Sequence, residues 1–196
     1  MRYRLTKNEI HSLIHKINEL RTQKGRVIVA IDGNSASGKS SLAAQLKLAF
    51  SCNVIPMDDF FLRAAQRTPK RLAEPGGNID YERFAQEVIH PLITGELFEY
   101  KPYDCQKQTL GEPVVINPNP ITIIEGVYSL HPRFIQAYDI KVFLHLDEAE
   151  QLRRLNERNP QMLDRFINEW IPMENKYFSV LKIQEKCDFV YGRGSP

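Results

Sequence analysis

The chain has 196 residues, of which 42% are hydrophobic and 26% charged, and its formal net charge is +2. These values are typical of a globular protein, and we expect one domain over residues 1–196. So small a charge does not indicate nucleic acid or an anionic membrane as the main partner. The sequence has no apolar run of the ~20 residues that a membrane span needs, no signal peptide and only three widely spaced cysteines. We therefore expect reduced thiols and a cytoplasmic protein.

Residues 6–23 are predicted to form an amphipathic helix. Thr6 and Glu9 have the spacing of a capping box, and Gly25 is placed to end the helix. One face of this helix is apolar and carries Ile10, Leu13, Ile14, Ile17 and Leu20. That face could pack on the core of its own chain or equally on a neighbouring copy, so the sequence leaves a homo-oligomer open.

The stretch Gly33-Asn34-Ser35-Ala36-Ser37-Gly38-Lys39-Ser40 fits the phosphate-binding P-loop pattern G-x-x-x-x-G-K-[ST]. It lies between a predicted strand at 27–31 and a predicted helix that begins with Ser41 and ends at residue 50. The motif requires this context, because backbone N–H groups and the helix N-terminus bind the phosphates together. Glycines at both ends allow a tight turn and a close approach to the ligand. Lys39 would reach the β- and γ-phosphates, and Ser40 would bind Mg²⁺.

An acidic pair follows the predicted strand at 52–56, in the sequence Met57-Asp58-Asp59-Phe60-Phe61. Acids at the carboxyl end of a strand lie where open α/β sheets bind ligands, although Asp is also a common helix N-cap. Asp58 could accept the proton of a substrate hydroxyl and orient it. Beyond the pair we expect a basic loop over 63–80, a helix over 81–93 and a loop or β-ribbon over 100–116.

A third carboxylate, Glu125, ends the apolar run at 121–125, which predicts a strand buried on both faces. It could hold Mg²⁺ directly or through water, or it could be an ordinary acid at a strand end. After a strand at 140–146, a charged helix over 148–158 carries three arginines, Arg153, Arg154 and Arg158. Such a cluster can close over phosphates as an arginine finger; for Arg153 an exposed basic helix is an equally good interpretation.

A second helical stretch over 162–177 should be kinked or broken by Pro172, and a last strand is expected at 188–191. Strands alternate with helices along the chain, which predicts an α/β fold with a doubly wound, five-stranded parallel sheet. We expect the three-layer α/β/α architecture of P-loop NTPases. Residues 148–178 would form a small helical lid and the helix that follows it.

These motifs resemble those of the phosphoribulokinase/uridine kinase group of P-loop kinases, which includes nicotinamide riboside kinases. The likeness covers most of residues 26–194. It rests on the P-loop and on five further segments: Asp58-Asp59-Phe60-Phe61, Asn78-Ile79-Asp80, Pro102-Tyr103-Asp104, Ile123-Ile124-Glu125-Gly126 and the lid arginines. Two weaker similarities are the stretch Trp170-Ile171-Pro172-Met173 with Lys176-Tyr177, and Arg193-Gly194 after the last strand.

The resemblance implies an ATP-dependent kinase that uses Mg²⁺ and phosphorylates a hydroxyl of a small-molecule substrate. It implies that Asp58 is the catalytic aspartate, that Asp80 and Tyr103 contact a nucleoside-like or ribosyl acceptor, and that Arg193 lies beside the nucleotide. Uridine kinases carry a His after the Tyr-Asp pair that helps to read the pyrimidine, and an Arg two residues later. Gln108 and Leu110 occupy those positions here.

This departure keeps other acceptors open, namely nicotinamide riboside, pantothenate or a sugar. A nucleotide-dependent NTPase or switch protein is a second class of function. The chain lacks two motifs of that class, the N-K-x-D motif that reads guanine and the L-S-G-G-Q segment of transport ATPases. A degenerate kinase that only binds nucleotide is a third possibility, but the intact Lys39, Ser40 and Asp58 argue against it.

Overall fold

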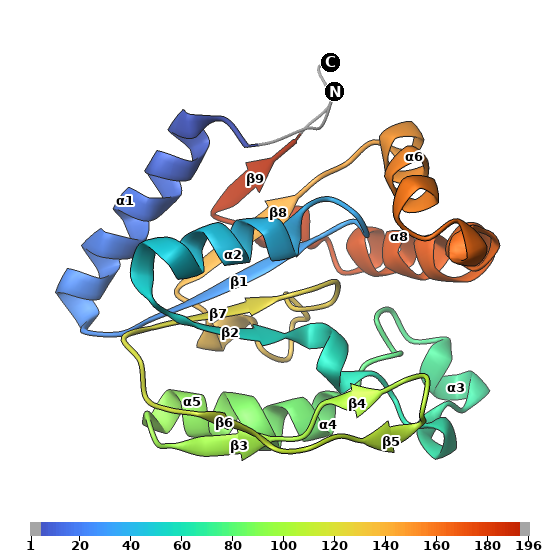
Figure 1. The fold of residues 1–196 in the computed structure, drawn as a ribbon, viewed down its shortest axis with the longest axis horizontal. Helices are drawn as coiled ribbons and strands as arrows, with labels where there is room; N and C mark the ends of the chain where they lie inside the picture. Colours follow the sequence, from blue (N-terminus) through green and yellow to red (C-terminus); the bar gives the residue numbers. More distant parts are fainter. Residues whose placement is uncertain (1–4, 193–196) are drawn as a thin grey trace.

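A parallel β-sheet forms the centre of the computed structural model, which describes residues 5–192 (Figure 1). Within those residues the sheet has five strands in the order β2-β7-β1-β8-β9. Their bounds are β1 (Val27–Gly33), β2 (Asn53–Pro56), β7 (Ile121–Glu125), β8 (Ile140–Leu144) and β9 (Phe189–Tyr191). The predicted doubly wound parallel sheet is thereby confirmed. The central strands β1 and β7 are buried along their whole length, as parallel strands covered by helices on both faces must be.

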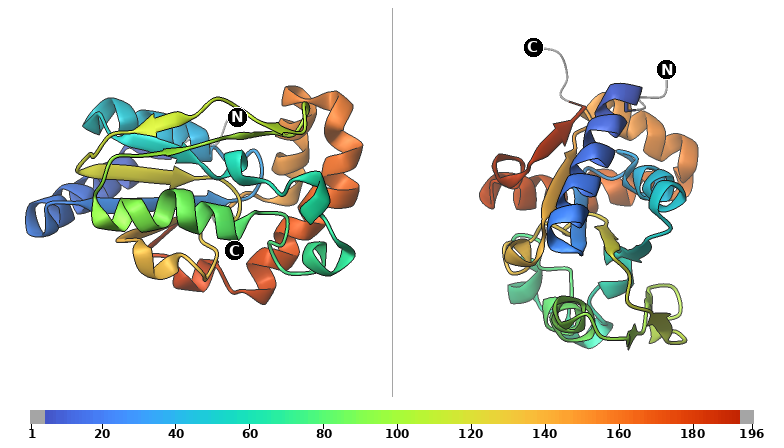
Figure 2. Two further views of the ribbon diagram at one scale, coloured as in Figure 1. Left: turned by 90° about the horizontal axis from the view of Figure 1, so that it is seen from below. Right: turned by 90° about the vertical axis from the view of Figure 1, so that its left-hand side faces the viewer.

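Helices cover both faces of the sheet, which gives the expected three layers (Figure 2). On one face, α1 (Lys7–Lys24) and α2 (Lys39–Phe50) pack on the strands. The apolar core on this side includes Leu13, Ile17, Val29, Leu46, Ile123 and Val142. The core on the other face is richer in aromatic residues and includes Phe60, Phe84, Tyr128, Phe143, Tyr177 and Phe178.

The first helix begins and ends where its sequence predicts. The Thr6 hydroxyl accepts from the Glu9 N–H at 3.2 Å, and the Glu9 carboxylate accepts from the Thr6 N–H at 2.7 Å, so the capping box is present. Gly25 ends the helix with a φ of 74°, a left-handed conformation that favours glycine. Leu13 and Ile17 are fully buried. The apolar face of α1 therefore packs on the core of its own chain.

Two helical stretches contain a wider, π-helical turn immediately before a proline-bearing segment. The first is α4 (Tyr81–Phe84), η3 (Ala85–Ile89) and α5 (His90–Thr94); the second is α7 (Leu163–Arg165), η6 (Phe166–Trp170) and α8 (Ile171–Val180). η3 and η6 are π-helical. Proline lacks an N–H, and its ring clashes with the carbonyl four residues earlier. The wider turn relieves this conflict, so the helix continues through Pro172; of the predicted kink or break, the break does not occur.

Other expectations need smaller corrections. The loop expected over 63–80 contains two short helical turns, η2 (Ala64–Gln66) and α3 (Pro69–Leu72). The ribbon consists of two antiparallel pairs, β3 (Phe98–Tyr100) with β6 (Val114–Ile116), and β4 (Tyr103–Asp104) with β5 (Thr109–Leu110). Strand β8 ends at Leu144 instead of residue 146, and the N–H of Leu146 bonds to the Asn34 side chain instead of a neighbouring strand.

The lid is a small helical unit beside the P-loop. It consists of α6 (Glu148–Arg158), the 3₁₀ turn η5 (Pro160–Met162) and the stretch from α7 to α8. Its own apolar cluster centres on Leu155, Phe166 and Ile171, and Ala36 of the P-loop packs against that cluster. Figure 1 shows the lid at the carboxyl ends of the strands, above α3 and the β4–β5 pair. Among residues 5–192, no helix has the length and apolarity to span a membrane.

Candidate active site

The P-loop connects β1 to α2, and the local backbone explains both of its glycines. Gly33 has a φ of 141°, and a Cβ there would lie 2.1 Å from the Leu144 carbonyl oxygen. The backbone of β8 thus leaves no room for a side chain at residue 33. This packing constraint could not be read from the sequence. Gly38 has open space around it but a φ of 102°, which side chains rarely adopt. Because α2 begins at Lys39, its N-terminus faces the site.

Three P-loop side chains, those of Asn34, Ser37 and Lys39, are buried. Lys39 donates to the carbonyl oxygens of Gly33 and Asn34, both at 2.9 Å. The Asn34 side chain accepts from the N–H of Leu146 at 3.0 Å and so ties the loop to the end of β8. The hydroxyl of Ser37 is buried and has no hydrogen-bond partner among residues 5–192. The ammonium group of Lys39 therefore lies inside the loop whose backbone is suited to bind phosphate.

The acidic pair lies in a 3₁₀ turn, η1 (Met57–Phe60), directly after β2. Asp59 accepts a hydrogen bond from the Tyr100 hydroxyl at 2.9 Å. Asp58 makes no hydrogen bond or ion pair with any residue of the described chain, and it is exposed to solvent. Desolvation by the surrounding protein raises the pKa of Asp58, while the positive charges of Lys39 and Arg158 oppose the rise. The two acids are thus distinguished: Asp58 is available to a ligand and Asp59 is held in place.

Glu125 and Ser40 lie together at the start of α2. The Ser40 hydroxyl donates to the Glu125 carboxylate at 3.2 Å. Burial raises the pKa of Glu125, and Lys39 and Asp58 are among the charges that act on it. A hydroxyl and a carboxylate are hard oxygen donors of the kind that Mg²⁺ prefers. No group of three or more His, Cys, Asp and Glu side chains within residues 5–192 is arranged to hold a metal ion, so further ligands would come from water and phosphate.

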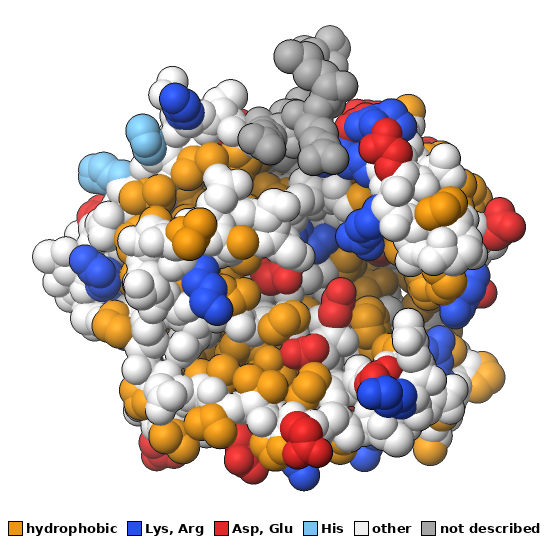
Figure 3. All heavy atoms as spheres, in the orientation of Figure 1, with side chains coloured by type: hydrophobic (Ala, Val, Ile, Leu, Met, Phe, Trp, Pro, Cys, Tyr) orange, Lys and Arg blue, Asp and Glu red, His pale blue; other side chains and the backbone are white. Residues whose placement is uncertain are grey.

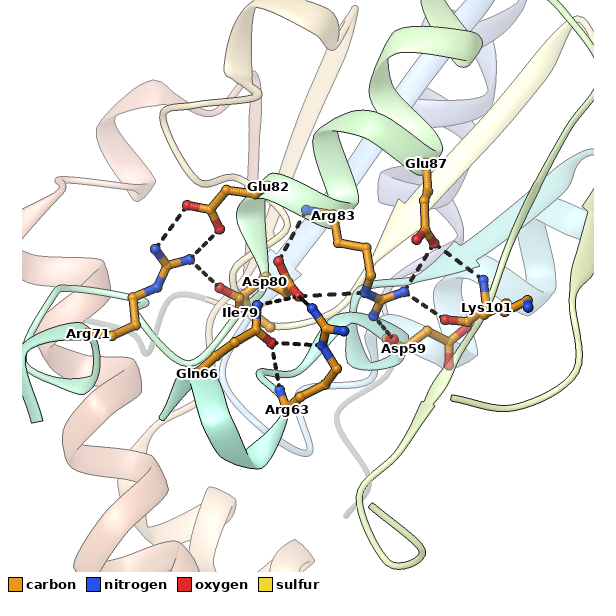
Figure 4. Close-up of polar contacts among 10 residues, drawn as sticks. All are labelled: Asp59, Arg63, Gln66, Arg71, Ile79, Asp80, Glu82, Arg83, Glu87 and Lys101. Carbon is orange, nitrogen blue, oxygen red and sulfur yellow. Dashed lines mark hydrogen bonds and ion pairs between the residues drawn. The ribbon is translucent and has the colours of Figure 1, made fainter. Parts of the chain in front are cut away.

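The acceptor side proposed from the resemblance is only partly accessible. Asp80 is 1% exposed, caps α4 through the Arg83 N–H at 3.1 Å and accepts from the Gln66 amide at 2.8 Å (Figure 4). Arg63 and Arg83 lie 3.8 Å from the same carboxylate. A ribose hydroxyl could reach Asp80 only by replacing Gln66 or Arg63.

Tyr103 and Gln108 belong to the short β4–β5 pair, which contacts the acidic turn η1. Tyr103 is buried in β4. Gln108 is exposed in the turn and has a φ of 55°. The structure therefore brings Tyr103 close to the acidic turn, whereas Gln108 lies at the outer tip of the hairpin.

The three lid arginines have different surroundings. Arg153 is exposed and pairs with Glu150 and Glu157 on its own helix, so the interpretation as an exposed basic side chain fits it. Arg154 donates to the Ala36 carbonyl oxygen at 3.1 Å and thus touches the P-loop. Arg158 is exposed, and its charge acts on Asp58. Arg193 lies outside the described residues.

Two buried carboxylates at the P-loop were not identified from the sequence. Asp32 is fully buried at the end of β1 and accepts from the N–H groups of Gly33, Tyr128 and Leu130 and from the Tyr177 hydroxyl. Burial raises its pKa to about 6. Asp32 follows the apolar run at 27–31, and an acid at the end of an apolar strand is the sequence feature that could have identified it. Glu174 of α8 accepts from the N–H of Ser35 at 3.0 Å, and nothing in its local sequence indicates this contact.

Figure 3 shows acidic side chains near the centre of one face, in a hollow bordered by basic side chains of the lid. Four separate elements contribute Lys39, Asp58, Glu125 and Arg158 to the site. The charges of Lys39 and Arg158 act on the carboxyl group of Asp58, and those of Lys39 and Asp58 act on that of Glu125. A site with an exposed carboxylate, a P-loop and nearby positive charges can align a hydroxyl with a phosphoryl group.

Comparisons with known proteins find uridine kinases among the similar sequences and structures. No protein-family model matches the chain. A uridine kinase of Clostridium perfringens is 24% identical over an alignment of 172 residues that covers 79% of this chain and 82% of that protein. The structure of a possible uridine kinase from Bacillus stearothermophilus superposes with a TM-score of 0.68 at 23% identity, over 92% of this chain and 100% of the other. A proposed fructose transport system kinase from Silicibacter sp. TM1040 has the same TM-score and identity, over 96% and 100% of the two chains.

The two solved structures share the fold of this chain, and the curated relatives share its sequence pattern over about four fifths of its length. Both findings agree with the resemblance drawn from the P-loop and from the Asp58 and Glu125 segments. The chain is a uridine kinase-like P-loop kinase, a phosphotransferase that acts on a hydroxyl group of a small molecule.

Proposed function

We propose that this protein, as one kinase domain over residues 1–196, transfers the γ-phosphoryl group of ATP, with Mg²⁺, to a hydroxyl of a nucleoside-like or ribosyl acceptor. The observation that carries the proposal is the state of Asp58. It is a solvent-accessible carboxylate that makes no hydrogen bond or ion pair with any of residues 5–192, and the positive charges of Lys39 and Arg158 act on it. An exposed carboxylate that no neighbouring side chain engages is free to accept a hydrogen bond from a substrate hydroxyl.

In the proposed reaction, the acceptor hydroxyl donates a hydrogen bond to Asp58, which orients the oxygen toward the γ-phosphorus. The bond from this oxygen to phosphorus forms while the bond to the bridging oxygen of ADP breaks, and the hydroxyl proton passes to Asp58. Because the transition state is loose, most of the proton transfer comes late and positioning dominates the rate.

Positive charge would stabilise the phosphoryl oxygens as charge spreads over them. Lys39 would turn from the carbonyl groups of Gly33 and Asn34 toward the phosphates. Arg154 and Arg158 would close on them from α6. Ser40 and Glu125 would hold Mg²⁺, which supplies neutralisation of the phosphate charge when bound. The backbone N–H groups from Gly33 to Ser41 would cradle the remaining oxygens.

The identity of the acceptor is the least constrained part of the proposal. The relatives are named uridine kinases, but Gln108 and Leu110 replace the expected His and Arg, and Gln108 lies at an exposed turn. Asp80 and Tyr103 remain the proposed acceptor contacts, and Arg193 the proposed nucleotide contact. A kinase for nicotinamide riboside, pantothenate or a sugar is the alternative that keeps the same chemistry.

An acceptor screen tests the proposal. We would measure ADP release from ATP and from GTP with Mg²⁺, in the presence of uridine, cytidine, nicotinamide riboside, pantothenate and hexoses. The expected result is stimulation by one acceptor and formation of a phosphorylated product by mass spectrometry. Folded protein that no acceptor stimulates, but that hydrolyses ATP with a protein partner, would contradict the proposal and favour the NTPase or switch class.

A further inference from the structure

Glu174 is a buried carboxylate that reaches into the P-loop from α8. It is 3% exposed, and its Oε2 accepts from the N–H of Ser35 at 3.0 Å. Its Oε1 also accepts a hydrogen bond from the Ser35 hydroxyl. A weaker contact at 3.4 Å comes from the amide of Gln151, which is itself buried in α6. The carboxylate thus takes both hydrogen-bond donors of one P-loop residue.

The lid holds the next residue of the loop as well. Arg154 donates to the carbonyl oxygen of Ala36 at 3.1 Å, and the Ala36 side chain packs against the apolar cluster of the lid. Ala36 has a φ of 64°, which costs energy for a residue other than glycine and requires support from its surroundings. Residues 35 and 36 are therefore held by both α6 and α8.

The negative charge of Glu174 would repel a triphosphate bound in the P-loop. P-loop N–H groups and the P-loop lysine form an anion site, and the charge of Lys39 acts on Glu174. A bound triphosphate would bring several negative charges into the same loop. Two anions in a partly buried site repel strongly, so the Glu174 carboxylate and the triphosphate disfavour one another.

We propose that Glu174 is a further residue of the triphosphate site, an internal anion bonded to Ser35 of the P-loop that lowers the affinity of the loop for the nucleotide. Binding of the triphosphate displaces or neutralises the carboxylate and so releases its bond to Ser35. Because Glu174 belongs to α8 of the lid, this release couples binding in the loop to the position of the lid. The inference rests on the proposed function, since it takes the triphosphate as the ligand.

The test is to measure affinity by titration calorimetry for ATP with Mg²⁺, inorganic tripolyphosphate and adenosine. Glu174→Gln keeps the shape of the side chain and a carbonyl oxygen for the Ser35 N–H but removes the charge. We expect the Kd for ATP and for tripolyphosphate to fall by about tenfold or more, since removal of one charge beside a polyanion has an effect of that order. Adenosine binding should not change.

Glu157→Gln is the matched control, because Glu157 is an exposed carboxylate of α6 that pairs with Arg153 away from the P-loop. It should alter the Kd for ATP by less than about twofold, as expected for an exposed charge. Glu174→Ala should also tighten triphosphate binding and serves if the glutamine variant does not fold.

The outcomes separate this inference from the proposed function. If the wild-type protein and the Glu174 variants all bind triphosphate, and the variants bind it with equal or lower affinity than wild type, the inference alone is overturned. Such a result would show that Glu174 is a structural support of the loop. Failure of the wild-type protein and of the variants to bind any triphosphate would overturn the proposed function, and this inference with it.

Discussion

Asp58 and Asp59 are adjacent in sequence but differ in their surroundings, and this difference predicts different effects of mutation. The Asp59 carboxylate accepts a hydrogen bond from Tyr100, whereas Asp58 has no partner among residues 5–192 and is acted on by the charges of Lys39 and Arg158. We expect Asp58→Asn to lower kcat by ~10²–10⁴-fold, because the hydroxyl loses both its orientation and its proton acceptor. ATP affinity should remain close to that of the wild-type protein. Steady-state kinetics with the identified acceptor and calorimetry with ATP measure the two quantities.

Asp59→Asn is the natural comparison, since an amide oxygen can still accept from the Tyr100 hydroxyl. Its kcat should stay within about tenfold of the wild-type value, an effect on the order of 1.4 kcal/mol. If instead Asp59→Asn were the inactive variant and Asp58→Asn the active one, the base role would belong to Asp59.

His131 gives a prediction about pH. Its ring is buried and lies 4.3 Å from the ring of Tyr81, between centroids, and burial, assisted by nearby Arg133 and Arg71, lowers its pKa from 6.5 to about 4. The unfolded chain takes up a proton near pH 6.5 and the folded protein does not. Stability is therefore present above pH 6.5 and lost as the pH falls toward 4.

His131→Phe preserves the aromatic packing and removes this titration. We expect the free energy of unfolding of this variant minus that of wild type to increase by about 2–3 kcal/mol when the pH is lowered from 7.5 to 4.5. Denaturant unfolding at both pH values measures the change. A difference between the two proteins that does not vary with pH would mean that His131 titrates in the same range in both states.

At the scale of elements, α6 carries arginines that can be compared on a single helix. Arg158 acts on Asp58, whereas Arg153 is bound to Glu150 and Glu157. We expect Arg158→Ala to lower kcat by ~10²-fold with little change in the KM for ATP, because its charge matters most as negative charge spreads in the transition state. Arg153→Ala should alter kcat by less than about twofold. A loss confined to KM in Arg158→Ala would indicate a ground-state contact instead.

Elements defined by short-range physics could be predicted from the sequence, and those that depend on distant partners could not. The capping box at Thr6, the P-loop between strand and helix, and the buried strand ending at Glu125 follow from local patterns. The π-helical turn before Pro172 was missed, because its wider hydrogen bonding depends on how the lid packs. A proline alone indicates a break.

The candidate site divides in the same way. Lys39, Ser40, Asp58 and Glu125 were found because motifs and strand ends place them at one edge of the sheet. The contact between Glu174 and Ser35 joins residues 139 positions apart, so no local pattern reports it. The burial of Asp80 behind Gln66 was missed for the same reason.

The whole molecule should respond to its ligand through the linkage between binding and folding. ATP with Mg²⁺ would join β1, α2 and the lid, elements that contribute separate apolar clusters on either side of the P-loop. At a ligand concentration of 100 times the Kd, binding adds about 2.7 kcal/mol to the free energy of unfolding. For a chain of this size that corresponds to a rise in Tm of roughly 5–10 °C, which differential scanning fluorimetry would detect.

Two variants divide this stabilisation between its sources. Lys39→Ala should abolish most of the rise in Tm, because it removes the cation that neutralises the triphosphate. Glu125→Gln should retain the rise seen with ATP and EDTA but lose the increment that Mg²⁺ adds, since an amide is a weaker ligand for a hard cation than a carboxylate. An undiminished response to ATP in Lys39→Ala would place the nucleotide outside the P-loop. An undiminished Mg²⁺ increment in Glu125→Gln would show that the metal is held by Ser40, water and phosphate without this carboxylate.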